Sequence, residues 1–111
     1  MDQCKNLGRI EESVAVYEEV LKHMPKNSLA WFNLGNAYDA LGDFRRAVRC
    51  FDQAIALEPN NAEYFYNKGV ILYEKGKTIR AKEAFDKALQ IRPDFIEAAM
   101  ARDDILKDLR G

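Results

Sequence analysis

The sequence predicts an all-α protein made of stacked helix pairs, and three observations predict it. Glycines and prolines each return three times at an interval of 34 residues, as Gly8, Gly42 and Gly76 and as Pro25, Pro59 and Pro93. Apolar and small residues return at the same interval, for example Tyr17, Phe51 and Phe85. Within each period the apolar residues are three or four positions apart, which is the spacing of an amphipathic helix. Repeats of this length are typical of solenoids, in which each unit stacks on its neighbours.

Residues 28–61 contain the clearest helix pair. Apolar and small residues at helical spacing mark two helices. Those of the first helix are Trp31, Leu34, Gly35 and Tyr38, and those of the second are Ala47, Val48, Phe51, Ala54 and Ile55. Between them, Gly42 suits the left-handed position that ends a helix, and Asp43 can cap the next helix. Pro59 follows the second helix and stops it. We therefore expect a helix, a tight turn and an antiparallel helix.

Gly35 lies inside the expected first helix, where a glycine costs about 1 kcal/mol relative to alanine. We interpret it as a place where the first helix approaches the second closely, opposite the small residue Ala47. Gly69 and Ala81 repeat this arrangement 34 residues later. The repetition indicates that the same close contact offsets the helical penalty in both pairs.

These residues resemble the tetratricopeptide repeat family, whose unit is a helix-turn-helix of about 34 residues. The matching residues of the first full unit are Trp31, Leu34, Gly35, Tyr38, Ala47, Phe51, Ala54 and Pro59, and those of the next are Phe65, Gly69, Ala81, Phe85, Ala88 and Pro93. The second unit departs from the family pattern at Lys68, where leucine is usual, and at Leu72, which replaces tyrosine. The resemblance implies a right-handed superhelix of helix pairs whose first helices line a concave binding surface.

The predicted organisation is a single tetratricopeptide domain over residues 1–111. Residues 1–27 would form a partial repeat, residues 28–61 and 62–95 two full repeats, and residues 96–111 a C-terminal capping helix. If Gly8 marks a turn, the first helix of the partial repeat is truncated to about seven residues, which is marginal on its own. Either the chain is a piece of a longer array, or a second copy supplies the missing cover.

Composition and motifs indicate a cytoplasmic protein without catalytic residues. Seventeen basic and eighteen acidic residues leave a formal charge of −1, so charge predicts neither a nucleic-acid nor a membrane partner. No apolar run is long enough to span a bilayer. Cys4 and Cys50 fit neither a disulfide framework nor a metal site, and we expect reduced thiols. No enzyme motif is present and His23 is the only histidine, so we expect no cofactor and no metal.

The candidate peptide-binding residues are those that the first helices present besides their packing residues, a surface we call the first-helix face. They are Phe32, Asn33, Asn36, Glu63, Tyr66, Asn67, Val70, Glu97 and Met100. Asparagines 34 residues apart suit a peptide ladder, because an amide both donates to and accepts from a peptide backbone; in tetratricopeptide proteins that bind extended peptides, asparagines on this face have that role. Phe32 and Tyr66 either line the groove or pack between helices.

Charge placement indicates the character of the partner. The first helices carry an acidic excess, whereas the basic residues Arg45, Arg46, Arg49, Lys77, Arg80, Lys82 and Lys87 lie on second helices. A partner segment with Lys or Arg beside apolar anchors is therefore favoured. One subtype of the family clamps chaperone tails with three cations, but those positions hold Phe32, Glu97 and Ala101 here, so we expect no such clamp.

We predict a non-catalytic protein-interaction scaffold that binds a peptide or helix of a partner. The alternative prediction is a self-associating structural module. In that alternative, copies of the chain would form a homo-oligomer through their N-terminal helices, at Ile10, Val14 and Tyr17.

Overall fold

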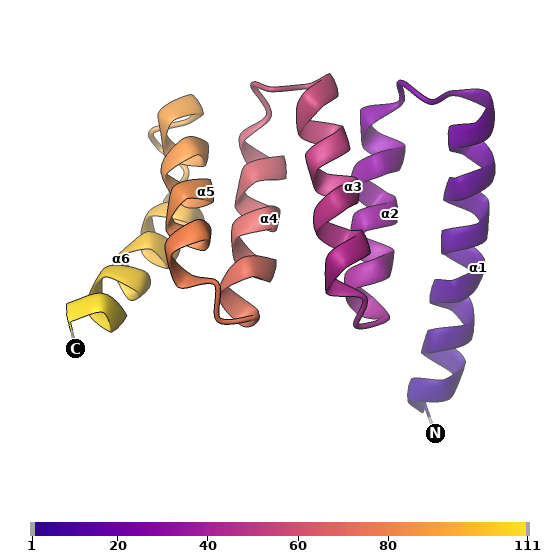
Figure 1. Cartoon of the computed structure of the whole chain (residues 1–111), viewed down its shortest axis with the longest axis horizontal. Helices are drawn as coiled ribbons and strands as arrows, with labels where there is room; N and C mark the ends of the chain where they lie inside the picture. The colour runs from indigo at the N-terminus through magenta and orange to yellow at the C-terminus, as the bar shows by residue number, and fades with distance from the viewer. Residues whose placement is uncertain (1, 111) are drawn as a thin grey trace. The chain divides into compact units, whose positions relative to one another are not determined.

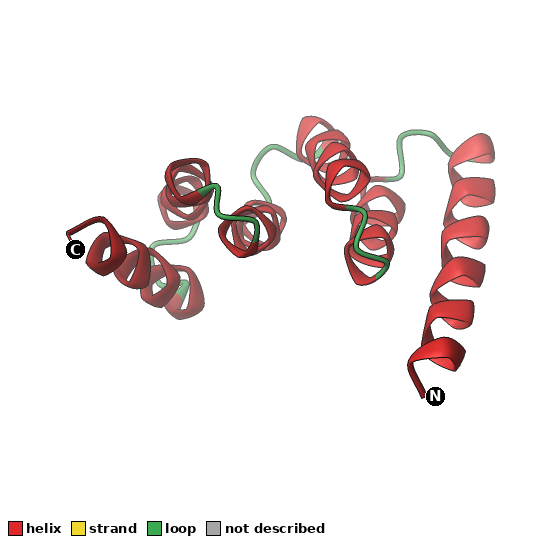
Figure 2. Ribbon diagram, turned by 60° about the horizontal axis from the view of Figure 1, so that its bottom comes forward, coloured by secondary structure: helices red, strands yellow, loops and turns green. Residues whose placement is uncertain are grey.

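The computed structural model describes the backbone of residues 2–110 and the side chains of residues 8–110, and all regular secondary structure in this part is helical (Figure 2). Its helices are α1 (Asp2–His23), α2 (Ser28–Ala40), α3 (Phe44–Leu57), α4 (Ala62–Glu74), α5 (Thr78–Ile91) and α6 (Ile96–Arg110). They form two compact units, Met1–Pro59 and Asn60–Gly111, with three helices each (Figure 1). The all-α fold class is thus confirmed, and the right-handed stacking of pairs stays a prediction from the resemblance.

A tight turn joins the antiparallel helix pair in each unit (Figure 1). Gly42 connects α2 to α3 at φ +83°, and Gly76 connects α4 to α5 at φ +78°. This left-handed conformation favours glycine. The N–H of the residue after each glycine donates back to the preceding helix, from Asp43 to the Tyr38 carbonyl at 2.9 Å and from Lys77 to the Leu72 carbonyl at 2.8 Å. These hydrogen bonds satisfy carbonyls at the helix end, so the 34-residue period reproduces the whole turn.

The helix pairs begin and end where the sequence predicts. Pro25, Pro59 and Pro93 lie in the loops after α1, α3 and α5. Asn27 caps α2 by accepting a hydrogen bond from the Ala30 N–H at 3.1 Å, and Asp43 caps α3 by accepting from the Arg46 N–H at 3.2 Å. Both caps satisfy backbone donors that have no partner inside the helix.

The N-terminal part of the chain differs from the prediction, because α1 is one uninterrupted helix of 22 residues. The expected turn at Gly8, and with it the truncated first helix within residues 1–27, is wrong. Gly8 does not have a positive φ, and a Cβ built on it would meet nothing within 4 Å. In the other two pairs the turn is supported by a first helix of 13 residues packed on the second. Gly8 instead lies inside α1, where the helix continues without a turn.

In the core of each pair, a buried phenylalanine of the second helix faces a glycine of the first helix. Phe51 is 0% and Phe85 is 1% exposed. A Cβ on Gly35 would lie 3.0 Å from Cε1 of Phe51 and 3.2 Å from the Ala47 carbonyl oxygen, and a Cβ on Gly69 would lie 2.8 Å from Cε1 of Phe85. The predicted close approach is therefore confirmed. Its main partner is the aromatic ring of the second helix rather than the alanine.

An ion-pair network connects α5 to the closing helix α6. The Asp86 carboxylate accepts from Lys82 Nζ at 2.9 Å on its own helix and from Arg102 Nη1 at 3.3 Å on α6. Burial alone would raise the pKa of Asp86. The hydrogen bonds from Lys82 and Arg102, together with their positive charges, outweigh burial and lower the pKa below its ordinary value of 3.8.

Replacing Asp86 with asparagine is expected to lower the free energy of unfolding by about 1 kcal/mol at neutral pH; the effect is modest because the side chain is 39% exposed and solvent screens the pair. A carboxyl whose folded pKa is lowered stabilises the fold above its unfolded pKa, and this contribution disappears as pH falls through the folded pKa. The difference between D86N and the parent should therefore vanish below pH 3.8. Urea denaturation across pH measures this, with Asp103→Asn on α6 as the exposed control. A difference that is independent of pH would contradict it.

Candidate functional site

The predicted peptide-binding residues lie on three helices. Phe32, Asn33 and Asn36 lie on α2 in the first unit, and the remaining residues lie on α4 and α6 in the second unit, as Glu63, Tyr66, Asn67, Val70, Glu97 and Met100. All nine are half-buried or exposed.

The two aromatic residues pack between helices. The ring centroids of Phe32 and Phe51 are 5.6 Å apart. Tyr66 lies between two rings, 5.7 Å from Phe85 and 5.0 Å from Phe95. Of the two interpretations left open by the sequence, packing is the one observed, although both side chains remain only half-buried.

The asparagines differ in how their amides are used. The side-chain amides of Asn33 and Asn36 make no hydrogen bond to any residue that the structure describes, and Asn36 is exposed. Asn67 donates from Nδ2 to the Glu63 carbonyl of its own helix at 2.8 Å. The α2 face therefore presents amides with unused donors and acceptors, whereas the Asn67 amide is partly satisfied by the α4 backbone.

In the second unit, α4 and α6 are bridged at two levels. The Tyr66–Phe95 contact lies at the beginning of α6, and the Tyr73 hydroxyl donates to the Asp108 carboxylate near its end. That hydrogen bond is the main cause of the raised pKa of Tyr73, with smaller effects from burial and from the charges of Asp108 and Asp104. Two side-chain contacts thus hold α4 beside α6, and both helices contribute predicted binding residues.

The α4 and α6 faces combine carboxylates with exposed apolar surface. Glu63 and Glu97 are exposed in the first turns of their helices, and Asp104 is exposed further along α6. Met100 is 63% exposed, and Val70 is half-buried on α4. This combination is chemically suited to a cationic segment with apolar side chains.

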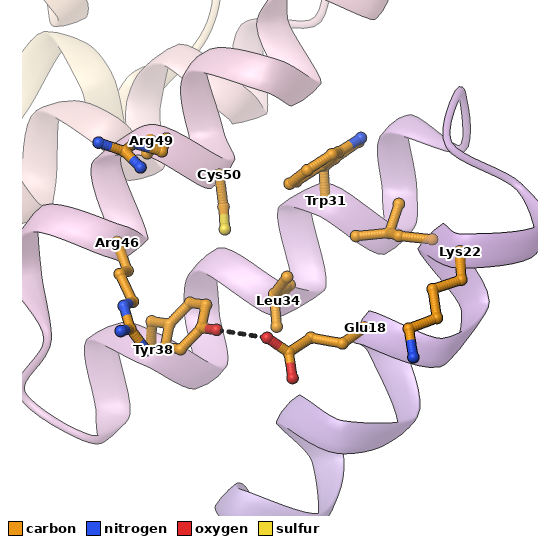
Figure 3. A pocket seen from close by; sticks show the side chains of 9 residues that line it. Glu18, Lys22, Trp31, Leu34, Tyr38, Arg46, Arg49 and Cys50 are labelled. Atoms are coloured by element: carbon orange, nitrogen blue, oxygen red, sulfur yellow. Dashed lines mark hydrogen bonds between the residues drawn. The ribbon is translucent and has the colours of Figure 1, made fainter.

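The first unit has a groove that was not predicted from the sequence, which we call the Trp31 groove (Figure 3). Its volume is about 520 Å³, and α1, α2 and α3 each contribute three lining residues: Glu18, Leu21 and Lys22; Trp31, Leu34 and Tyr38; Arg46, Arg49 and Cys50. Leu34, Tyr38 and Cys50 are buried, whereas Trp31 is half-buried. The groove therefore has a largely apolar floor with charged side chains at its edges.

Hydrogen bonds and burial set the chemistry of this groove. The Tyr38 hydroxyl donates to Glu18 Oε2 at 2.9 Å (Figure 3). Burial, followed by this contact, raises the pKa of Tyr38. Burial and then the Glu18 charge raise the pKa of the Cys50 thiol to about 11. Cys50 is a free thiol, as predicted, but it is protonated at neutral pH and is a weak nucleophile. The side chain of Cys4 lies outside the described residues.

The second unit has a smaller groove at equivalent positions, with a volume of about 290 Å³. It is lined by Phe65, Lys68, Leu72, Arg80, Glu83, Ala84 and Lys87. Trp31, Leu34 and Tyr38 lie 34 residues before its first three lining residues. The basic second-helix residues at the edges of both grooves were noticed from the sequence. The apolar floors were not predicted, because the aromatic and leucine residues that form them were assigned to the core.

Two other kinds of feature, a metal-binding cluster and a membrane-spanning helix, are absent from the described residues. No group of three His, Cys, Asp or Glu side chains there could hold a metal ion. None of the helices formed by residues 2–110 combines the length and the low charge needed to cross a bilayer.

Comparisons with known proteins agree with the fold. A sequence model described as "Tetratricopeptide repeat" matches residues 34–94, and one described as "TPR repeat" matches residues 2–42. No curated protein sequence matches the chain. Among solved structures, the first TPR of Spaghetti (RPAP3) bound to the HSP90 peptide SRMEEVD is similar, with a TM-score of 0.87, 22% identity, and 99% of this chain and 87% of that chain covered.

Two further solved structures are similar. The NMR structure of the first TPR domain of human RPAP3 has a TM-score of 0.85 at 22% identity, covering 98% of this chain and 86% of that chain. A mutant O-GlcNAc transferase of Thermobaculum terrenum has a TM-score of 0.79 at 30% identity, covering 95% of this chain but 20% of that chain. The first repeat model alone spans more than half of the 111 residues, and its match coincides with the turns and buried aromatics seen here. This chain therefore belongs to the tetratricopeptide repeat family.

Proposed function

We propose that the chain is a non-catalytic protein-interaction module that binds a segment of a partner protein on its first-helix face. The observation that carries this proposal is the pair of α2 amides, Asn33 and Asn36, which have no hydrogen-bond partner among the described residues. An extended peptide offers an N–H and a C=O at each residue, and a free amide can satisfy both. Membership of a family whose repeats generally serve protein interaction supports the same conclusion.

The proposed partner segment carries Lys or Arg beside apolar side chains. Exposed carboxylates of Glu63, Glu97 and Asp104 favour cations, and Met100 offers an exposed apolar contact. The similar domain of Spaghetti binds the peptide SRMEEVD, which supports peptide capture by this fold. That peptide carries acidic residues near its C-terminus. The carboxylates of Glu63, Glu97 and Asp104 would repel such a peptide, because like charges across an interface are unfavourable. We therefore propose a positively charged partner segment for this chain.

To test this, peptides are selected on the whole chain from a random phage-displayed library. Those that carry Lys or Arg beside apolar residues are then synthesised and titrated. Replacing Asn33 and Asn36 together with alanine is expected to weaken their binding about tenfold or more, since each lost amide contact costs roughly 1 kcal/mol. Isothermal titration calorimetry measures the affinities. Gln53→Ala with Gln90→Ala is the matched control, because it removes two exposed amides from the second helices α3 and α5. Equal affinities in the asparagine variant and the parent would contradict the proposal.

Self-association through α1 is retained as the alternative proposal. Ile10, Val14 and Tyr17 are half-buried on this helix, and Val16 is 59% exposed. Since α1 packs on α2 within its unit, a second copy would have to cover these residues from the other side. Light scattering over a range of concentrations distinguishes this alternative from a monomeric binding module.

A further inference from the structure

We propose that the Trp31 groove is a second docking site, for an acidic segment of a partner protein that carries a leucine or an aromatic side chain. The groove and the first-helix face consist of different residues, so this proposal does not depend on the proposed function. The apolar floor of the groove, the charges at its edges and the smaller groove of the second unit support this assignment.

The floor suits one or two apolar side chains. Its volume of about 520 Å³ lies within the range of ligand pockets, roughly 300 to 1,000 Å³. Leu34 lies at the centre, with Trp31 and Tyr38 on either side along α2 (Figure 3). The Trp31 indole N–H donates to the Pro25 carbonyl at 3.0 Å, which fixes the half-buried ring beside the groove. A leucine or aromatic side chain of a partner would find preformed apolar contacts there.

The edges favour an anion. Three cations, Lys22, Arg46 and Arg49, line the groove against one carboxylate, Glu18, which accepts the Tyr38 hydrogen bond. The positive charge of Arg46 is partly compensated, because its Nε lies 3.5 Å from Oδ2 of Asp43. Lys22 is 75% exposed and lies 3.7 Å from Glu19.

Arg49 is the cation left for a ligand. It makes neither an ion pair nor a hydrogen bond with any described residue. A carboxylate on a bound segment could form a bidentate, charge-assisted contact with this guanidinium.

A peptide suits this arrangement better than a nucleic acid. A phosphate backbone needs a continuous basic track, whereas Glu18 lines the α1 edge, Glu19 pairs with Lys22, and Asp43 lies next to Arg46. A peptide can place one or two carboxylates at the α3 edge and an apolar side chain in the floor. An acidic and apolar segment therefore matches both features of the groove.

The second unit supplies an internal comparison. Its smaller groove has Glu83 at the position that Arg49 occupies in the first, 34 residues earlier. A glutamate at this position is thus compatible with a folded helix pair. Arg49→Glu should remove the net positive charge of the docking site without disturbing the fold, because two cations then face two carboxylates. Circular dichroism checks that the helix content is kept.

The experiment selects random dodecapeptides without tryptophan on the whole chain and titrates them by the emission of Trp31, the single tryptophan of the protein. Peptides that shift this emission are expected to be enriched in Asp and Glu beside Leu or Phe. Their affinity should fall about tenfold or more in R49E. The matched control is Arg45→Glu, since Arg45 is exposed on the same helix but does not line the groove.

Four outcomes would overturn the proposal. These are a selection in which no peptide shifts Trp31 emission, shifting peptides without an acidic excess, equal losses in R49E and R45E, and an oligothymidylate that shifts the emission at lower concentration than any peptide. The last outcome would assign the groove to nucleic acid. Loss of binding in R49E but not in the Asn33 and Asn36 variant supports the groove even if the first-helix proposal fails.

Discussion

Replacing Phe51 with alanine is expected to lower the free energy of unfolding by about 4 kcal/mol, the largest effect of any single truncation proposed for this chain. The ring is 0% exposed, lies against Gly35, and has its centroid 5.6 Å from that of Phe32. Removing it loses the free energy of apolar burial and leaves a cavity that Gly35, without a side chain, cannot fill. Urea denaturation followed by circular dichroism measures the change.

Ile79 is the matched control for this truncation, because its side chain is 61% exposed on the second helix of the other pair. Ile79→Ala should change the free energy of unfolding by no more than about 0.5 kcal/mol. A loss below about 1 kcal/mol in Phe51→Ala would show that the ring is not the core of its helix pair.

Gly69→Leu is expected to be destabilising by about 3 kcal/mol, although leucine is the better helix former. Even a Cβ at this position would lie 2.8 Å from Cε1 and 3.0 Å from Cζ of Phe85. The Phe85 ring is 1% exposed and packs against Tyr66, so it cannot move aside cheaply. The same denaturation experiment measures the loss.

Gly8→Leu is the matched control for this substitution. Gly8 is also inside a helix, but a Cβ there meets nothing within 4 Å. Only helix propensity then changes, and we expect a gain of somewhat under 1 kcal/mol. If both leucine variants were stabilising, helix propensity rather than close packing would govern these positions.

The parts of the fold that depend on local chemistry could be predicted from the sequence. Gly42 and Gly76 adopt the left-handed turn, and Asp43 caps α3, because backbone conformation and capping are decided within a few residues. The close approach at Gly35 was also predictable, since a glycine inside a helix implies a neighbour. Its partner, the Phe51 ring, was not identified, because sequence spacing does not specify which atoms of the second helix come nearest.

The incorrect and missing predictions concern residues whose state depends on tertiary packing. Gly8 shares the spacing of the turn glycines, but it lies inside the uninterrupted helix α1 and does not have a positive φ. Trp31 and Tyr38 belong to the family pattern and were assigned to the core. The structure shows that they also line a groove, together with side chains from α1 and α3. The asparagine ladder on the first-helix face stays a prediction.

The contact between Phe51 and Gly35 also bears on how the chain folds. Its two residues are close in sequence, and so are Phe85 and Gly69 in the second pair. Bringing together residues at such short separation costs little chain entropy, and proteins dominated by local contacts fold quickly. We therefore expect either pair to be able to act as the nucleus of folding, with structure then spreading to the helices beside it.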